Sequence, residues 1–171
     1  MIYLDNNATT QPLPEVVEAM HTCLRDAYAN PSSVHQFGQA VRHKVECARE
    51  QIARLIGAPP KEIIFTSGGT ESINLAIRGG LRIHPERRRF VTTAVEHSAV
   101  LRVAEQLAGE GYTVDYVGVD HDGRIDESEW ADKINDQTAL VSLMHVNNET
   151  GVMFDVVRLA AVAAEKGVPV H

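Results

Sequence analysis

From residue 62 onward, short apolar runs alternate with segments of helical periodicity, and this alternation limits the fold more than any other feature. The strand-like runs cover 62–66, 90–94, 113–119 and 139–146. The helical segments lie near 70–82, 98–109, 127–136 and 155–166. Helices in these gaps serve as crossovers between parallel strands, and solid apolar composition is typical of strands buried on both faces. The sequence predicts an α/β fold: a mostly parallel sheet with helices on both faces.

Two helical segments precede this pattern. The first begins at Pro14, and its apolar spacing places Cys23 on its buried face. The second has Ser32 or Ser33 as a possible cap and Gly57 as its end. Both helices are predicted to pack through one apolar face.

The last residues, 166–171 (KGVPVH), contain a helix-ending glycine followed by an apolar run. They predict one more parallel strand, which Pro169 slightly disfavours. We expect residues 1–171 to be a single incomplete domain. Residues 1–30 form an N-terminal segment with the first helix, and residues 31–171 form a large ligand-binding part that lacks its last strands.

The overall charge excludes one class of function. The formal net charge is −7, whereas nucleic-acid binders normally carry a basic face. No apolar run approaches the ~18 residues of a membrane span, and the first ten residues lack a signal peptide's features. The two cysteines and eight histidines show no metal-ligand spacing. We expect a cytoplasmic protein that binds no nucleic acid, membrane or metal.

Polar clusters follow three of the predicted strands. These are SGGTES (67–72), EHS (96–98) and NNETG (147–151). Parallel strands bring their carboxyl ends to one edge of the sheet, where open α/β proteins bind ligands. The convergence of the three clusters at one edge is stronger evidence for a ligand site than any single cluster.

The SGGT sequence opens a helix, where free N–H groups and the positive end of the dipole favour an anion. Gly68 and Gly69 would allow close approach of a phosphate, and the Thr70 hydroxyl could donate to it. The sequence is neither a P-loop nor a dinucleotide fingerprint. A purely structural turn is the alternative.

His97 lies between a predicted strand and a helix that Ser98 could cap. An imidazole there can stack on a planar ligand or transfer protons, and a solvated loop histidine is the alternative. Asn148 lies in a turn-prone run and could hydrogen-bond a ligand hydroxyl; a plain turn is the alternative.

Residues 118–129 match part of a calcium loop. Gly118 occupies the position where such a loop has aspartate, and a strand, not a helix, precedes it. A turn around Asp122 and Gly123 is the favoured interpretation.

Taken together, the sequence resembles the cysteine desulfurases of the iron–sulfur-assembly branch, within the class V aminotransferase group of pyridoxal-phosphate enzymes. The matching blocks follow the family's order and cover nearly the whole chain: YLDNNATT (3–10), NPSS.H (30–35), EIIFTSGGTES (62–72), EHSAVL (96–101) and NNETG (147–151).

The resemblance implies the large domain of a fold-type I enzyme with pyridoxal 5'-phosphate as its cofactor. Gly69 and Thr70 would hold the phosphate, His97 would stack on the ring and assist proton transfer as a catalytic residue, and Asn148 would bond the ring hydroxyl. The implied reaction converts L-cysteine to L-alanine and an enzyme-bound persulfide. A homodimer that passes sulfur to a scaffold or carrier protein is also implied.

The resemblance also implies that the Schiff-base lysine and the nucleophilic cysteine lie beyond the matched region. The chain by itself is therefore expected to be inactive. Two alternatives remain open: a non-catalytic relative that binds a phosphate ligand or a partner, and another class V aminotransferase or lyase.

Overall fold

A computed structural model describes residues 2–171, which divide into two compact units, with the boundary in the sequence between Phe65 and Thr66. The prediction of one incomplete domain, with an internal boundary at residues 30–31, stays a prediction.

The first unit contains two long helices, α1 (Pro14–Asp26) and α2 (Gln36–Ile56), and a short 3-10 turn, η1 (Pro60–Glu62). Helix α2 ends as predicted, because Gly57 adopts the left-handed conformation with φ 70°. Its predicted serine caps are wrong: the imidazole of His35 accepts the N–H of Gly38 instead. Cys23, expected in a core, is exposed along with the rest of the α1 apolar stripe.

The predicted strand 62–66 is wrong. Residues 60–62 form η1, and residues 63–66 belong to no strand. Ile63 does have extended backbone angles, φ −86° and ψ 123°. The described residues place no neighbouring strand beside this segment, so its apolar composition produced extended backbone without a sheet ladder.

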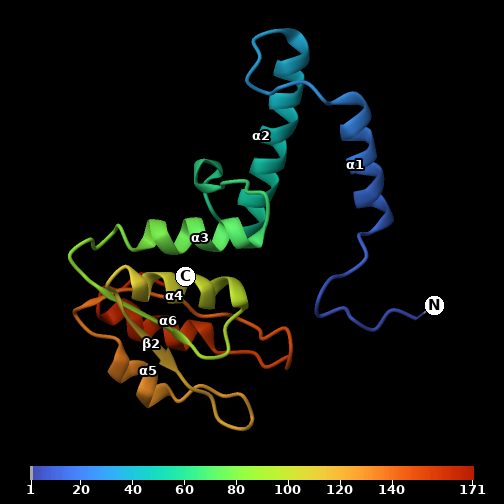
Figure 1. The fold of residues 1–171 in the computed structure, drawn as a ribbon. Coiled ribbons are helices and arrows are strands. Elements are labelled where there is room, and N and C mark those ends of the chain that lie inside the picture. The colour runs from blue at the N-terminus through green and yellow to red at the C-terminus, as the bar shows by residue number, and fades with distance from the viewer. Residues whose placement is uncertain (1) are drawn as a thin grey trace. The chain divides into compact units, whose positions relative to one another are not determined.

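The second unit alternates helices and strands as predicted. Its elements are α3 (Gly69–Gly80), β1 (Arg89–Thr93), α4 (Ser98–Gly109), β2 (Thr113–Val117), α5 (Glu127–Lys133), β3 (Thr138–Val141) and α6 (Val156–Glu165). The three strands are all parallel, in the order β2-β1-β3. The final run continues this sheet as a single parallel bridge between Val170 and Val141. Figure 1 shows α3 in green and α4 in yellow-green, and contacts join the two helices.

Alternate side chains of each strand point to opposite faces of the sheet, and each face has its own core. Val91, Val117 and Val141 face Trp130 of α5 and Leu159 of α6. On the other face, Phe90 and Leu140 pack with apolar residues of the remaining two helices: Ile77 of α3 and Val100, Val103 and Leu107 of α4. Helices cover both faces, as predicted.

The connections that follow the neighbouring strands β1 and β3 lead to helices on opposite faces of the sheet. After β1 the chain enters α4, which packs on the Phe90 face. After β3 it enters α6, which packs on the Val91 face. Strands β1 and β3 are adjacent, so the loops that leave their carboxyl ends diverge to opposite sides of the sheet. Open α/β sheets bind their ligands at such a switch point.

Candidate functional site

The start of α3 has uncapped donors. Gly68 is the N-cap residue, and no side chain of the described residues caps this helix. The first N–H groups of a helix have no partner within it, and the macrodipole adds positive potential. The start of α3 therefore remains suited to an anion.

Neither glycine in this loop is required by the protein's own structure. Gly68 has φ 167°, which is ordinary extended backbone, and Gly69 is not among the residues with positive φ. A Cβ added to either would meet no atom of the described residues within 4 Å. Neither available space nor a positive φ therefore requires glycine at these positions, and both positions leave room for close approach of a ligand.

The Glu71 side chain bonds back to Ser67, at the start of the loop that precedes α3. Its carboxylate accepts hydrogen bonds from the N–H and the hydroxyl of Ser67, both at 2.6 Å. The hydroxyl bond, followed by the N–H bond, lowers the pKa of Glu71. The carboxylate is therefore engaged within its own loop.

His97 serves as the N-cap of α4, and the prediction that Ser98 caps this helix is wrong. The Nδ1 of His97 accepts the backbone N–H of Ala99 at 3.1 Å. An accepting Nδ1 carries no proton, so the neutral ring carries its proton on Nε2. The cap thereby fixes both the tautomer and the orientation of an exposed imidazole.

Thr70 and His97 line one hollow between α3 and α4, with a volume of about 490 Å³. Ligand pockets usually span about 300–1,000 Å³. Arg102, Asn74 and Gln106 also line it and were missed by the sequence reasoning. Arg102 lies one helical turn after Ser98, so helical spacing from the EHS cluster was the available signal. Its guanidinium contacts Glu105 at 2.8 Å.

Asn148 does not line this hollow. It is exposed, and its amide donates to the Glu149 carboxylate at 3.0 Å. Its buried neighbour Asn147 joins the two loops instead: the Asn147 amide donates to the Val95 carbonyl at 3.0 Å. The structure therefore brings Thr70 and His97 together directly and connects the Asn148 loop to the His97 loop through Asn147.

The partial calcium loop folds as a turn. Gly123 adopts φ 80°, and a bridge pairs Val119 with Ile125. The carboxylate of Asp120 accepts the N–H groups of Asp122 and Arg124 at 2.9 and 2.8 Å. No group of three metal-ligating side chains occurs among residues 2–171. The favoured turn around Asp122 and Gly123 is confirmed.

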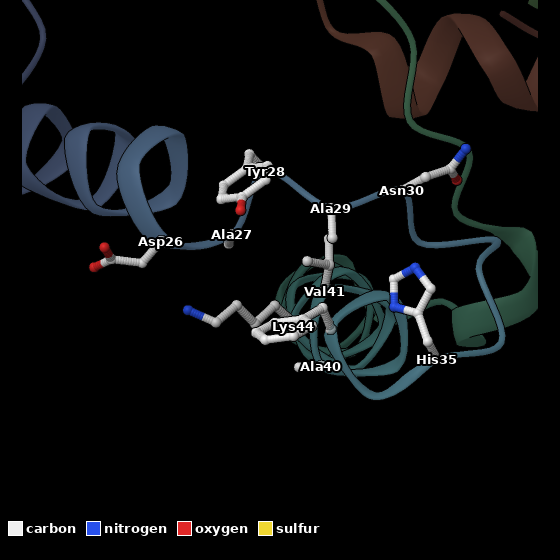
Figure 2. Close-up of a pocket in the computed structure, with 10 residues that line it drawn as sticks. Asp26, Ala27, Tyr28, Ala29, Asn30, His35, Ala40, Val41 and Lys44 are labelled. Atoms are coloured by element: carbon white, nitrogen blue, oxygen red, sulfur yellow. The ribbon is translucent and has the colours of Figure 1, made fainter.

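A separate hollow of about 310 Å³ lies within the first unit. Figure 2 shows Tyr28, which follows α1, His35, which caps α2, and Lys44, which lies within α2, around it. It borders the NPSS.H block through Asn30 and His35 but contains none of the predicted site residues. In the described part of the chain, no helix is long and apolar enough to cross a membrane.

Comparison with known proteins identifies the family. The aminotransferase class-V family profile matches residues 2–171. A cysteine desulfurase of Enterobacter agglomerans is 49% identical over 171 residues, which is 99% of this chain and 43% of that protein. A cysteine desulfurase NifS of Azotobacter vinelandii is 44% identical, over 99% of this chain and 42% of that protein.

A solved NifS-like protein superposes with a TM-score of 0.95 at 37% identity, over 99% of this chain and 48% of that one. The chain thus spans a little under half the length of these relatives. With a profile match along nearly its whole length, the chain belongs to the aminotransferase class-V family.

Proposed function

We propose that this chain is the N-terminal part of a pyridoxal-phosphate-dependent cysteine desulfurase. The whole enzyme would convert L-cysteine to L-alanine and leave the sulfur as a persulfide on an enzyme cysteine. Support comes from relatives named cysteine desulfurase at up to 49% identity, and from residues that fit the cofactor. One solved relative, 35% identical, is described as SspA in complex with cysteine.

The residues at α3 fit a phosphate group. A Cβ built on either glycine meets no described atom within 4 Å, no side chain caps the helix, and Thr70 follows in its first turn. In this proposal Gly69 and Thr70 hold the phosphate, as the helix N-terminus directs both N–H groups and positive potential at it. Arg102 also lines the hollow and carries a positive charge, which its ion pair with Glu105 partly balances.

His97 fits a planar ring. Its cap holds Nδ1, which leaves the face of the imidazole for stacking and Nε2 for proton exchange. When bound, pyridoxal phosphate would supply an electron sink for bond cleavage next to an amino group. His97 would orient that ring and move a proton at Nε2. Asn148 remains the proposed partner of the ring hydroxyl.

The single observation that carries the proposal is that Thr70 and His97, 27 positions apart in the sequence, line one hollow beside two unexplained glycines. Isothermal titration of the chain with 4-deoxypyridoxine 5'-phosphate tests it. This analogue has no aldehyde, so it cannot react with surface lysines. Saturable binding that Thr70→Val weakens is expected. Binding that is absent, or unchanged in Thr70→Val, would overturn the proposal.

A non-catalytic relative is the second candidate, and both candidates predict that no lysine of this chain serves the site. Lys133 donates to the Tyr116 carbonyl, and Lys166 donates to the carbonyls of Ala131 and Ile134. None of these groups belongs to the Thr70–His97 hollow. The mass of the natural polypeptide separates the two candidates, since only a longer chain can carry a Schiff-base lysine and a nucleophilic cysteine matching those of its relatives.

The remaining parts of the proposal concern the whole enzyme. We propose a cytoplasmic homodimer that passes sulfur to an iron–sulfur scaffold or a sulfur-carrier protein. The family resemblance supports these features, and another class V aminotransferase or lyase would share the site built here.

A further inference from the structure

The loops that follow β1 and β3 need some contact other than the sheet to hold them together. Their following loops diverge to helices on opposite faces of the sheet, so the sheet ladder does not hold the loop tips together. Yet the His97 side chain belongs to one loop and the Asn148 side chain to the other. A ligand that touches both needs a fixed distance between them.

Two buried polar side chains bridge these loops in opposite directions. Glu96, 7% exposed, extends from the first loop and accepts the backbone N–H of Met144 at 2.6 Å. Asn147, 8% exposed, extends from the second loop and donates to the Val95 carbonyl at 3.0 Å. Each side chain thus bonds the backbone of the other loop, immediately beside a proposed ligand-binding residue.

Asn147 also shapes its own loop. Its side-chain oxygen accepts the N–H groups of Glu149 and Thr150 at 2.9 and 3.0 Å. Its nitrogen donates to the Val95 carbonyl across the gap and to the Met144 sulfur, at 3.6 Å, in its own loop. Both ends of the amide group are therefore bonded within the protein. The Asn147 side chain is used internally, and that of Asn148 is exposed.

We propose that Glu96 and Asn147 are positioning residues that fix His97 and Asn148 at a set distance across the switch point. This inference rests on the proposed function, because it concerns recognition of a ring that both loops contact. Phosphate recognition at Gly69 and Thr70 belongs to α3 and does not depend on either loop tip.

Burying a carboxyl group is costly unless its oxygens have partners, and burial raises the pKa of Glu96. An apolar side chain at this position would leave the N–H of Met144 without this acceptor. The carboxyl oxygen instead accepts a bond that fixes the backbone of the opposite loop.

The test compares two ligands on the full chain: 4-deoxypyridoxine 5'-phosphate and inorganic phosphate. Glu96→Ala and Asn147→Asp should each weaken binding of the ring-containing ligand by about tenfold or more. The reason is that misplacement of a contacting side chain by about 1 Å is costly. Inorganic phosphate should bind equally to all forms. Glu96→Gln keeps the acceptor oxygen and should restore ring binding, and Thr150→Ala serves as the control in the same turn.

Hydrogen exchange at the Met144 amide gives a second measurement that does not require ligand. Its protection should fall in Glu96→Ala and persist in Glu96→Gln. Ring binding unchanged in Glu96→Ala and Asn147→Asp, or equal loss of both ligands, would overturn the positioning role alone. A wild-type chain that binds phosphate but not the ring ligand would overturn the proposed function and this inference with it.

Discussion

His97 accepts the backbone N–H of Ala99 through Nδ1 at 3.1 Å, so the imidazole that lines the hollow also begins helix α4. One side chain thus has two separable duties. The cap needs an acceptor of suitable length, and the proposed ligand contact needs an aromatic ring.

Replacing His97 separates these duties. His97→Ala should lower the free energy of unfolding of the second unit by about 1 kcal/mol, the usual cost of a lost cap. His97→Asn should recover most of that stability, because asparagine is a good N-cap, while both variants lose binding of the ring ligand. Urea unfolding followed by Trp130 fluorescence measures the stability. Equal stability of the alanine and asparagine variants would contradict the capping role.

Gly69→Ala tests the reason for the second glycine. The added methyl group meets no atom of the described residues, so unfolding stability should hold or rise. Inorganic phosphate binding should fall, because the methyl group occupies the approach of the anion. Gly79→Ala is a matched control in the same helix, and its added methyl group also meets open space. It should raise the free energy of unfolding by about 0.5–1 kcal/mol without changing phosphate binding. Full phosphate binding by Gly69→Ala would refute the close-approach argument.

Glu96 predicts a pH effect on stability. Burial raises its pKa in the folded state, so its contribution to stability is present below its unfolded pKa of about 4.3 and is lost as pH rises through the folded value. Glu96→Gln stays neutral and lacks this loss. As pH rises from about 4.3 through the folded pKa of Glu96, the wild type should therefore lose stability relative to the variant. Parallel curves for the two proteins would exclude a raised pKa.

Gly38→Ala tests packing in the first unit. A Cβ at this position would lie 2.6 Å from the Ser33 Cβ and 2.7 Å from the carbonyl oxygens of Asn30 and Ser33. Two of these atoms are backbone and cannot yield easily, so about 1–3 kcal/mol of destabilisation is expected. Hydrogen exchange within α2 would report it. Stabilisation comparable to that of Gly79→Ala would contradict the close approach.

The sequence predicted the second unit well because its periodicities matched its burial. The α4 bounds agree with 98–109, and β1 and β2 begin within one residue of their predicted starts. The strand at 62–66 failed for a physical reason: a strand requires a hydrogen-bonding neighbour, which local composition cannot supply. Cys23 failed similarly, since an amphipathic stripe predicts that a helix has an apolar face but not what covers it.

The candidate site was predicted in its chemistry but not in its connections. Thr70 and His97 follow from helix starts at the carboxyl side of a parallel sheet. The bonds from Glu96 to Met144 and from Asn147 to Val95 cross about 50 residues of sequence, a spacing that no local pattern records. Histidine caps were missed for another reason: serine was the stronger statistical choice at both helices.

The extended segment 63–66 has a consequence for handling the protein. Ile64 and Phe65 are 67% and 50% exposed, beside backbone that no ladder of the described residues occupies. Such a stretch is a template onto which a like stretch from another molecule can anneal. Concentrated stocks should therefore become turbid and stain with thioflavin, and a charged substitution at Ile64 should keep them clear.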